Sequence, residues 1–184
     1  MYDLKYTYEP GTFNQEYKTI LNEENTILLD KDDLPSIISD TFKNGQYKTV
    51  KNTKPIVLYR VWGKVKKENT LISNADYYGS FATTEFAESK IDVKLRLSLN
   101  PKWRNPRLYE CKILVPTGTK LNFGIVASIK LENGTVFCGG ADQVLLPQDW
   151  SNAWIIGCRK VTPQQIHQVP EYPLDFFSIA KFSF

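Results

Sequence analysis

Residues 135 to 147 read Thr-Val-Phe-Cys-Gly-Gly-Ala-Asp-Gln-Val-Leu-Leu-Pro, which predicts a β-strand with two glycines near its start. The apolar run at 144 to 146 favours a strand, whereas Gly139 and Gly140 weaken one and usually mark a close approach by a ligand or by another backbone. The amide of Gln143 can donate and accept hydrogen bonds to hydroxyls and amides of a small molecule, so Gln143 is the leading candidate for the functional centre. The alternative is a glycine bulge in an antiparallel sheet, with Gln143 facing water.

Length and composition predict a single globular domain spanning residues 1 to 184. A chain of 184 residues can bury roughly 70% of its unfolded surface in one core, and 42% of its residues are hydrophobic, as in ordinary globular proteins. The net charge of +3 is well below the clustered positive charge of a dedicated nucleic-acid binder. A nucleotide-sized anion is therefore a better expected partner than a nucleic acid.

The sequence shows no signal peptide, membrane span, disulfide framework or cluster of metal-binding residues. No basic segment followed by an apolar run occurs in residues 1 to 20, and no run of about 18 apolar residues occurs anywhere, so neither a signal peptide nor a membrane span is expected. Cys111, Cys138 and Cys158 are odd in number and widely spaced, which favours reduced, mostly buried thiols over a zinc site or a disulfide scaffold. The single histidine, His167, excludes chemistry that needs several histidines, and no metal site is expected.

Strands account for most of the predicted regular structure. Asn133-Gly134 is a strong hairpin signal and joins a strand ending near Leu131 to the one that carries Gln143. The polar residues 64 to 76 predict a mobile loop. Further strands are expected at 55 to 62, 107 to 115, 120 to 129 and 153 to 161.

Two main helices are expected. The first begins after Asp32-Asp33-Leu34-Pro35, where an aspartate can cap and a proline suits the first turn, and it ends at Asn44-Gly45. At 91 to 99 strict alternation fits a strand, yet Thr83 or Thr84 is a plausible cap, and a helix at 85 to 96 is the prediction. Residues 1 to 30 predict an irregular arm with one short helix near 13 to 22, and the aromatic tail at 162 to 184 is expected to dock on the sheet.

Arg60 interrupts the otherwise apolar and aromatic stretch Pro-Ile-Val-Leu-Tyr-Arg-Val-Trp at 55 to 62. Burying a guanidinium costs several kcal/mol unless it is paired, and the geometry of a phosphate matches its fork of donors. Arg60 is therefore a candidate phosphate ligand. The alternative is a salt bridge to a neighbouring carboxylate at a sheet edge.

Aromatic and small hydroxyl side chains surround a glycine at residues 77 to 84, Tyr-Tyr-Gly-Ser-Phe-Ala-Thr-Thr. Rings such as those of Tyr78 and Phe81 can stack on a flat heterocycle, with on the order of 1 kcal/mol per contact. They can equally be core aromatics, which is the commoner use of such residues.

Three motifs in this order carry a resemblance to a known family: Leu-Tyr-Arg-Val-Trp-Gly at 58 to 63, Gly-Ser-Phe-Ala-Thr-Thr at 79 to 84, and Gly-Gly-Ala-Asp-Gln-Val at 139 to 144. Their order and spacing resemble the NAD-consuming bacterial toxin domains of the ADP-ribosyltransferase fold, in the branch of the tuberculosis necrotizing toxin and the C-terminal domains of polymorphic toxins. The similarity extends over roughly residues 34 to 150 and includes segments at 41 to 47, 101 to 103 and 115 to 119.

The resemblance implies an α+β fold, with a split, strongly twisted antiparallel β-core, a few flanking helices and a cleft that grips NAD. Arg60 would hold the pyrophosphate or a ribose, and Gln143 would stand where many relatives carry the catalytic glutamate. Tyr78 or Phe81 would pack on the nicotinamide. Ser80 and Thr83 would brace the strand, and Gly139 and Gly140 would form part of the cofactor site.

The function implied is an NAD(P)+ glycohydrolase toxin. Arginine-modifying transferases have Gln or Glu two residues before their catalytic glutamate, where this chain has Ala141, and a neutral amide activates an acceptor poorly. Water is therefore the expected acceptor. Two alternatives stay open: a mono-ADP-ribosyltransferase with a protein or nucleic-acid target, and a non-catalytic β-rich binding module. By resemblance, the domain would act in a cytoplasm after delivery within a larger secreted protein, and a cognate immunity protein would block it.

Overall fold

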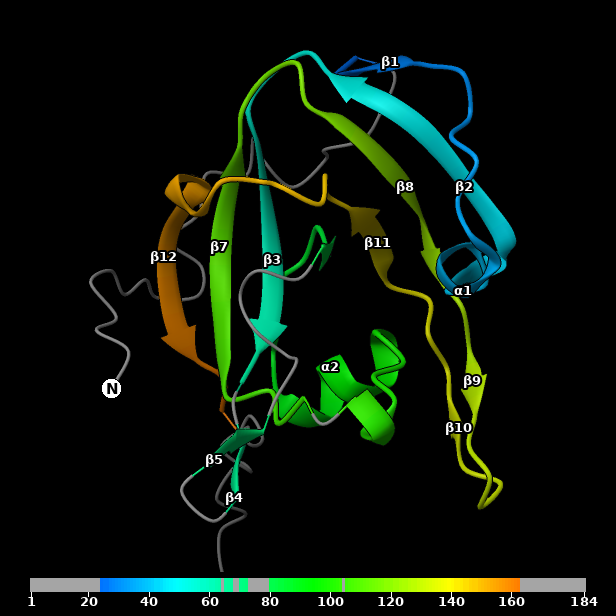
Figure 1. Cartoon of the computed structure of the whole chain (residues 1–184), viewed down its shortest axis with the longest axis vertical. Coiled ribbons are helices and arrows are strands. Elements are labelled where there is room, and N and C mark those ends of the chain that lie inside the picture. The colour runs from blue at the N-terminus through cyan, green and yellow to red at the C-terminus, as the bar shows by residue number, and fades with distance from the viewer. Residues whose placement is uncertain (1–23, 64, 68–69, 73–79, 104, 163–184) are drawn as a thin grey trace, which may run out of the picture.

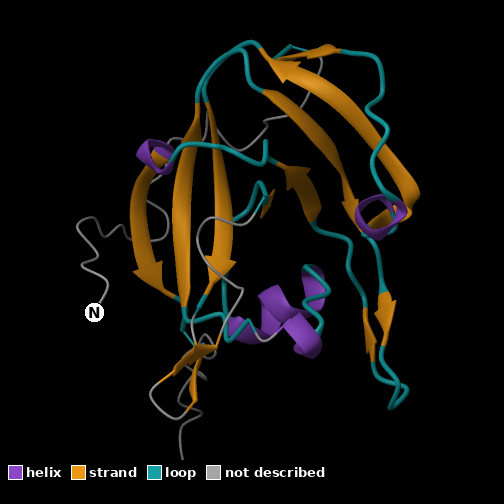
Figure 2. Cartoon of the chain, in the orientation of Figure 1, coloured by secondary structure: helices purple, strands orange, loops and turns teal. Residues whose placement is uncertain are grey.

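The computed structural model describes residues 24–63, 65–67, 70–72, 80–103 and 105–162. Strands dominate these residues, every strand pair is antiparallel, and the helices are short, so the expected α+β class is confirmed (Figure 2). The predicted helix at 13 to 22, the aromatic tail and Tyr78 lie outside the described residues. Within the described part, no helix has the length and apolar character needed to cross a membrane.

The described strands form two main sheets and two small hairpins. The larger sheet has the order β1 (Thr26–Leu28), β2 (Phe42–Asn52), β8 (Lys120–Val126), β11 (Asp142–Leu145), β6 (Phe81–Ala82). The smaller sheet has the order β12 (Ile155–Lys160), β7 (Tyr109–Val115), β3 (Ile56–Trp62). The hairpins are β4 (Val65–Lys67) with β5 (Thr70–Ile72), and β9 (Ile129–Lys130) with β10 (Val136–Phe137).

The two sheets join at one end, where the β2–β3 and β7–β8 connections lie together, and they diverge toward α2 (Lys90–Arg96) at the other (Figure 1). Asn52, only 1% exposed, ties the two connections together. Its Nδ2 donates to the carbonyls of Lys54 (2.8 Å) and Pro116 (2.9 Å), and its Oδ1 accepts from the Thr119 amide (2.7 Å). A buried amide with all these bonds made fixes how the sheets meet.

The core lies between the two sheets near this joined end. It contains Leu121 and Val144 from the larger sheet and Leu58 and Ile113 from the smaller, each fully buried. The prediction of β3 succeeds because apolar and aromatic residues surround Arg60 on both sides of it in the chain, and every residue of this strand except Arg60 is buried. The structure also confirms, within a few residues at their ends, the strands expected near 107 to 115, 120 to 129 and 153 to 161. The Asn133-Gly134 hairpin is confirmed as a turn, but it joins β9 to β10, and the expectation that its second strand carries Gln143 is wrong because Gln143 lies in β11, which pairs with β8.

The predicted helix from residue 36 to Asn44-Gly45 is wrong beyond its first turn. The helix α1 covers only Ser36–Ser39, and Ile37 is 81% exposed rather than packed on a core. Asn44 (φ 57°) and Gly45 (φ 65°) form a bulge inside β2 rather than a helix end. The same left-handed residues suit a helix stop and a strand bulge, and burial of Phe42 in the sheet decides for the strand.

The second helix is confirmed in position but begins later than predicted. The cap is Ser89, whose hydroxyl accepts from the Asp92 amide (3.1 Å), and not Thr83 or Thr84. Thr83 instead pairs with Tyr59 in a β-bridge. The expected loop at 64 to 76 contains the β4–β5 hairpin, and Cys138 is exposed, so the expectation of mostly buried thiols fails for this residue.

Candidate active site

A cavity of about 740 Å³ lies between the two sheets, and both Arg60 and Gln143 line it. This volume is in the range of pockets that hold small molecules and cofactors. The two residues come from different sheets, Arg60 from β3 and Gln143 from β11. The other lining residues come from the segments at 40–41, 59–61, 81–82, 97–99, 102–103 and 126–129, together with Asn105.

The short strand β6 joins the two sheets at the cavity. On one side Phe81 pairs with Leu145 of β11, and on the other Thr83 exchanges backbone hydrogen bonds with Tyr59 of β3 (2.8 and 2.9 Å). Arg60 Nη1 donates to the carbonyl of Phe81 (2.7 Å), which fixes the guanidinium at this junction. Because β6 holds β3 and β11 together, an arginine early in the chain and a glutamine late in it share one cavity.

Gln143 is buried, with 7% of its surface exposed, so the alternative in which it faces bulk water is wrong. Its Nε2 donates to Thr41 Oγ1 at 2.7 Å. Within the part of the chain that the structure describes, no hydrogen bond is found to its Oε1. The side chain therefore presents a held amide nitrogen and a carbonyl oxygen beside the cavity.

Gly139 and Gly140 allow a left-handed backbone conformation before β11, and neither residue lines the cavity. A Cβ on Gly139 (φ +64°) would lie 2.6 Å from the carbonyl oxygens of Val126 and Ala127. Gly140 (φ +92°) has open space around it and donates its N–H to the Val126 carbonyl (3.0 Å). Gly139 is therefore explained by the close approach of another backbone segment rather than by a ligand. The prediction of one strand over 135 to 147 is therefore wrong, because the segment contains two strands, β10 and β11, connected by the irregular residues 138 to 141.

Ser80, Phe81 and Thr83 have different relations to the cavity. Phe81 lines it, whereas Ser80 and Thr83 lie at either end of β6 outside the lining. Ser80 accepts from the Leu146 amide (2.8 Å) and Thr83 pairs with Tyr59, so both hold β6 through backbone bonds. Binding of a cofactor by their side chains stays a prediction, as does the role of Tyr78.

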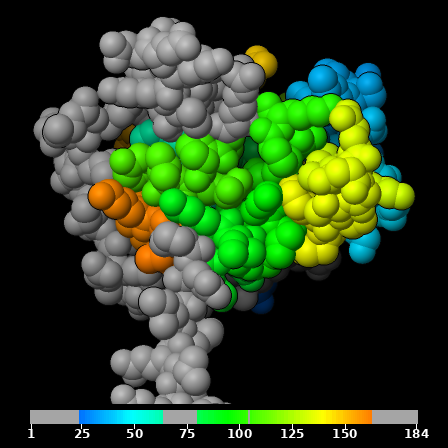
Figure 3. Space-filling model, turned by 90° about the horizontal axis from the view of Figure 1, so that it is seen from below, coloured from blue at the N-terminus to red at the C-terminus, as the bar shows by residue number. Residues whose placement is uncertain are grey.

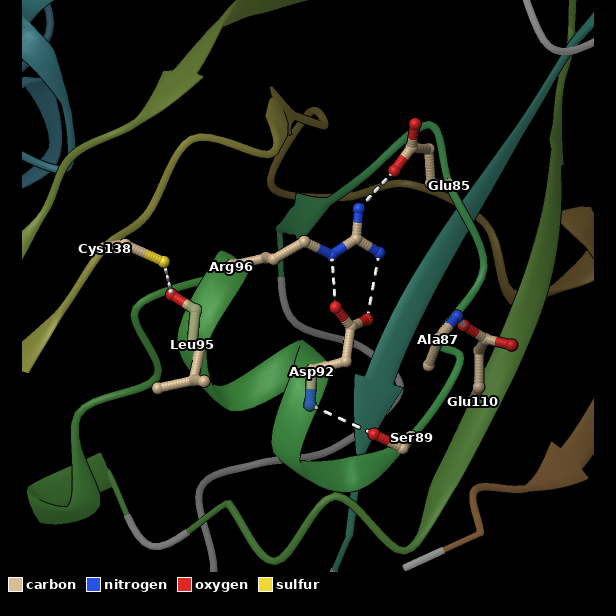
Figure 4. Close-up of polar contacts among 8 residues, drawn as sticks. All are labelled: Glu85, Ala87, Ser89, Asp92, Leu95, Arg96, Glu110 and Cys138. Carbon is tan, nitrogen blue, oxygen red and sulfur yellow. Dashed lines mark hydrogen bonds and ion pairs between the residues drawn. The ribbon is translucent and has the colours of Figure 1, made fainter. Parts of the chain in front are cut away.

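Part of the cavity wall, Leu97 to Leu99, directly follows the C-terminal end of α2, where Arg96 forms ion pairs (Figure 4). Arg96 Nε lies 2.7 Å from Asp92 Oδ1, one turn earlier, and its Nη1 also bonds to Glu85 in the preceding loop. The carbonyls of Leu95 and Arg96 accept from the amides of Gly139 (3.0 Å) and Ala141 (3.4 Å). These bonds attach α2 to the segment that leads to Gln143.

The cavity has a basic and aromatic rim. Lys102 and Trp103, in the 3-10 helix η2 (Pro101–Trp103), line it, and Trp103 is 51% exposed. Lys102 Nζ lies 2.6 Å from Glu132 at the turn between β9 and β10, so it connects the rim to that hairpin. The space-filling view shows the same closeness, with the hairpin against the 80 to 110 region (Figure 3). In the sequence, Lys102 and Trp103 stand out only as part of the segment 101 to 103 that shares the family resemblance, and the sequence predicts no role in the site for them.

Tyr59 lines the cavity, and its hydroxyl is protonated at neutral pH. Burial raises the pKa of Tyr59 to about 12, and the nearby Glu110 carboxylate adds to the rise. Glu110 itself is fully buried and accepts from Arg159 Nε (2.8 Å) and the Ala87 amide (2.5 Å). This ion pair supports the loop that precedes α2 and does not line the cavity.

No protein-family model and no curated protein sequence matches the chain. A partial structural likeness is found to Tne2, which was solved in complex with Tni2. The TM-score is 0.45 at 19% identity, and the match covers 64% of this chain and 93% of that one. A likeness of this strength identifies neither family nor function.

Proposed function

We propose that this chain is an NAD(P)+ glycohydrolase toxin domain that cleaves the bond between nicotinamide and ribose. The observation that carries the proposal is that Arg60 and Gln143 line one cavity of about 740 Å³. A guanidinium suits the pyrophosphate, and a carboxamide oxygen suits a ribose hydroxyl. The aromatic side chains of Tyr59, Phe81 and Trp103 in the same lining offer faces for the flat ring systems of a dinucleotide.

The chemistry of this cleavage fits a site without histidine or a carboxylate pair. As the glycosidic bond breaks, its electrons go to the nicotinamide nitrogen and the ribose becomes oxocarbenium-like. Nicotinamide leaves as a neutral molecule, so no strong general acid is needed. Water then adds to the ribose and loses a proton, which gives ADP-ribose. A rigid pocket that holds the ribose hydroxyls and shields the cation from bulk water favours this reaction.

The surroundings of Gln143 favour water as the acceptor over a macromolecule. Gln143 brings no negative charge, and Ala141, two residues before it, is 7% exposed and carries only a methyl group. Neither side chain can act as a general base toward the nucleophile of a bound protein. By the resemblance, an immunity protein that covers the cavity would protect the cytoplasm in which the toxin is made.

The test is product analysis after incubation of the purified chain with NAD labelled in its adenine moiety, and with NADP in parallel. Free ADP-ribose and nicotinamide, with no label on added protein or RNA, are the expected result. Label kept on a macromolecule would indicate the transferase instead, and unchanged NAD and NADP would support the non-catalytic module. Gln143→Ala is expected to abolish turnover and to keep the free energy of unfolding within about 1 kcal/mol of the wild-type value, since it removes one hydrogen bond and no contact of the apolar core.

A further inference from the structure

Thr41 and Gln143 lie 102 positions apart in the chain, and their side chains meet beside the cavity. Gln143 Nε2 lies 2.7 Å from Thr41 Oγ1, and the same Oγ1 lies 2.6 Å from the carbonyl oxygen of Ile38. A hydroxyl has one proton, and a carbonyl oxygen can only accept. The Thr41 proton is therefore directed to Ile38, and the lone pairs of Oγ1 remain for Gln143.

This arrangement selects one of the two orientations of the Gln143 carboxamide. Only the NH2 end can donate to an oxygen whose own proton is engaged elsewhere. If the amide turned over, two acceptor oxygens would face each other in a site where Gln143 is 7% exposed, and the cost would be that of a buried unsatisfied pair. The carbonyl end, Oε1, is therefore the end available to a hydroxyl in the cavity.

Thr41 is itself held in place by the backbone. Its amide donates to the Ile38 carbonyl (3.0 Å), and its carbonyl accepts from the Ala127 amide (2.8 Å). The bulge in β2 brings it there. Between the pairs Tyr47↔Gly124 and Phe42↔Val126, five steps along β2 match two steps along β8. The extra residues of β2 between Phe42 and Tyr47 shift its register on β8, and Thr41, just before the strand, lines the cavity.

Gly124 makes room for the bulge of β2 that lies between the pairs Tyr47↔Gly124 and Phe42↔Val126. Gln143 and Gly124 are directly paired, so a side chain on Gly124 would project from the same face as Gln143. Alternate strands of a sheet are about 10 Å apart, and β2 and β11 are on opposite sides of β8. A Cβ on Gly124 would lie 2.7 Å from both the Gln46 carbonyl oxygen and Phe42 Cδ1, two groups of the bulged segment.

We infer that Thr41 is a positioning residue for the proposed cleavage: its hydroxyl orients the Gln143 carboxamide so that Oε1 accepts from a ribose hydroxyl of the bound nucleotide. The inference rests on the proposed function. It assigns Thr41 no contact with the substrate. Loss of the Thr41 hydroxyl should therefore lower kcat, because bond cleavage needs the oriented oxygen. It should change KM little, because affinity for the substrate depends mainly on other parts of the cavity.

The test compares Thr41→Val, which keeps the shape and removes the hydroxyl, with Thr41→Ser, which keeps the hydroxyl. For NAD hydrolysis, Thr41→Val is expected to lower kcat by about ten- to a hundredfold with KM changed less than about threefold, and Thr41→Ser to restore most of the rate. Thr119→Val is the matched control, because Thr119 Oγ1 donates to the Pro116 carbonyl (2.7 Å) on an exposed turn and does not line the cavity. It is expected to keep the wild-type kcat.

A second measurement separates positioning from folding. The side-chain amide protons of Gln143, assigned in a ¹H–¹⁵N spectrum by their loss in Gln143→Ala, should exchange with water faster in Thr41→Val and at the wild-type rate in Thr41→Ser. Wild-type kcat in Thr41→Val, equal losses in both Thr41 variants, or unchanged Gln143 exchange would each overturn the inference while the glycohydrolase proposal stands. Failure of the wild-type chain to consume NAD or NADP would overturn both.

Discussion

The paired substitutions Gly139→Ala and Gly140→Ala separate two costs that a side chain would meet beside the candidate site. Both glycines have φ in the left-handed region, +64° and +92°, so alanine at either position strains the backbone. Only Gly139 has backbone atoms in the path of a Cβ, with the carbonyl oxygens of Val126 and Ala127 at 2.6 Å. Around Gly140 the space is open.

The expected magnitudes follow from these two observations. A left-handed alanine costs about 1–2 kcal/mol, partly offset by about 0.4–1 kcal/mol from the less flexible unfolded chain, so Gly140→Ala should lower the free energy of unfolding by about 1 kcal/mol. Gly139→Ala carries the same strain and a clash that no side-chain rotation can relieve. Overpacking of this kind adds about 2 kcal/mol. The total loss should be about 3 kcal/mol.

Urea unfolding followed by tryptophan fluorescence measures the difference, with the buried Trp62 and Trp150 as probes. With a slope of about 2 kcal/mol per molar urea, Gly139→Ala should unfold about 1 M earlier than Gly140→Ala. Since Val126 and Ala127 line the cavity, NAD turnover should also fall further in Gly139→Ala. Equal midpoints for the two variants would refute the close backbone approach, and wild-type stability in Gly139→Ala would indicate a glycine kept for a ligand instead.

Arg60→Ala is expected to raise KM for NAD and to lower kcat, because a lost phosphate contact weakens substrate and transition state together; steady-state kinetics with unchanged KM would contradict this role. Glu110→Gln should lower the free energy of unfolding by about 3–5 kcal/mol, measured in urea, because it leaves the 9%-exposed Arg159 without its charged partner. Hydrogen bonding from Lys120 lowers the pKa of Asp32, so this carboxylate stabilises the fold above its unfolded pKa and the benefit is lost as pH falls through the folded value. The stability gap between wild type and Asp32→Asn should therefore begin to narrow as pH falls below about 4 and disappear below the folded pKa, and a gap that stays constant through this range would contradict the pairing.

Local signals in the sequence determined several elements of the fold, and the family resemblance supplied its class. The apolar run at β3 and the Asn133-Gly134 turn each depend on residues that are neighbours in the chain, so their conformations follow from propensity and φ preference alone. Arg60 and Gln143 could also be singled out locally, because a charge inside an apolar strand and an amide beside two glycines stand out against their surroundings.

Tertiary structure decided what those local signals leave open. Asn44-Gly45 supplies left-handed residues equally suited to a helix end or a bulge, and only pairing of β2 with β8 selects the bulge. The contact between Thr41 and Gln143 depends on that bulge, and the bulge in turn depends on the missing side chain of Gly124 in a third segment. A hydrogen bond between residues 102 positions apart has no local signature, because it exists only once the sheet has brought the three segments together.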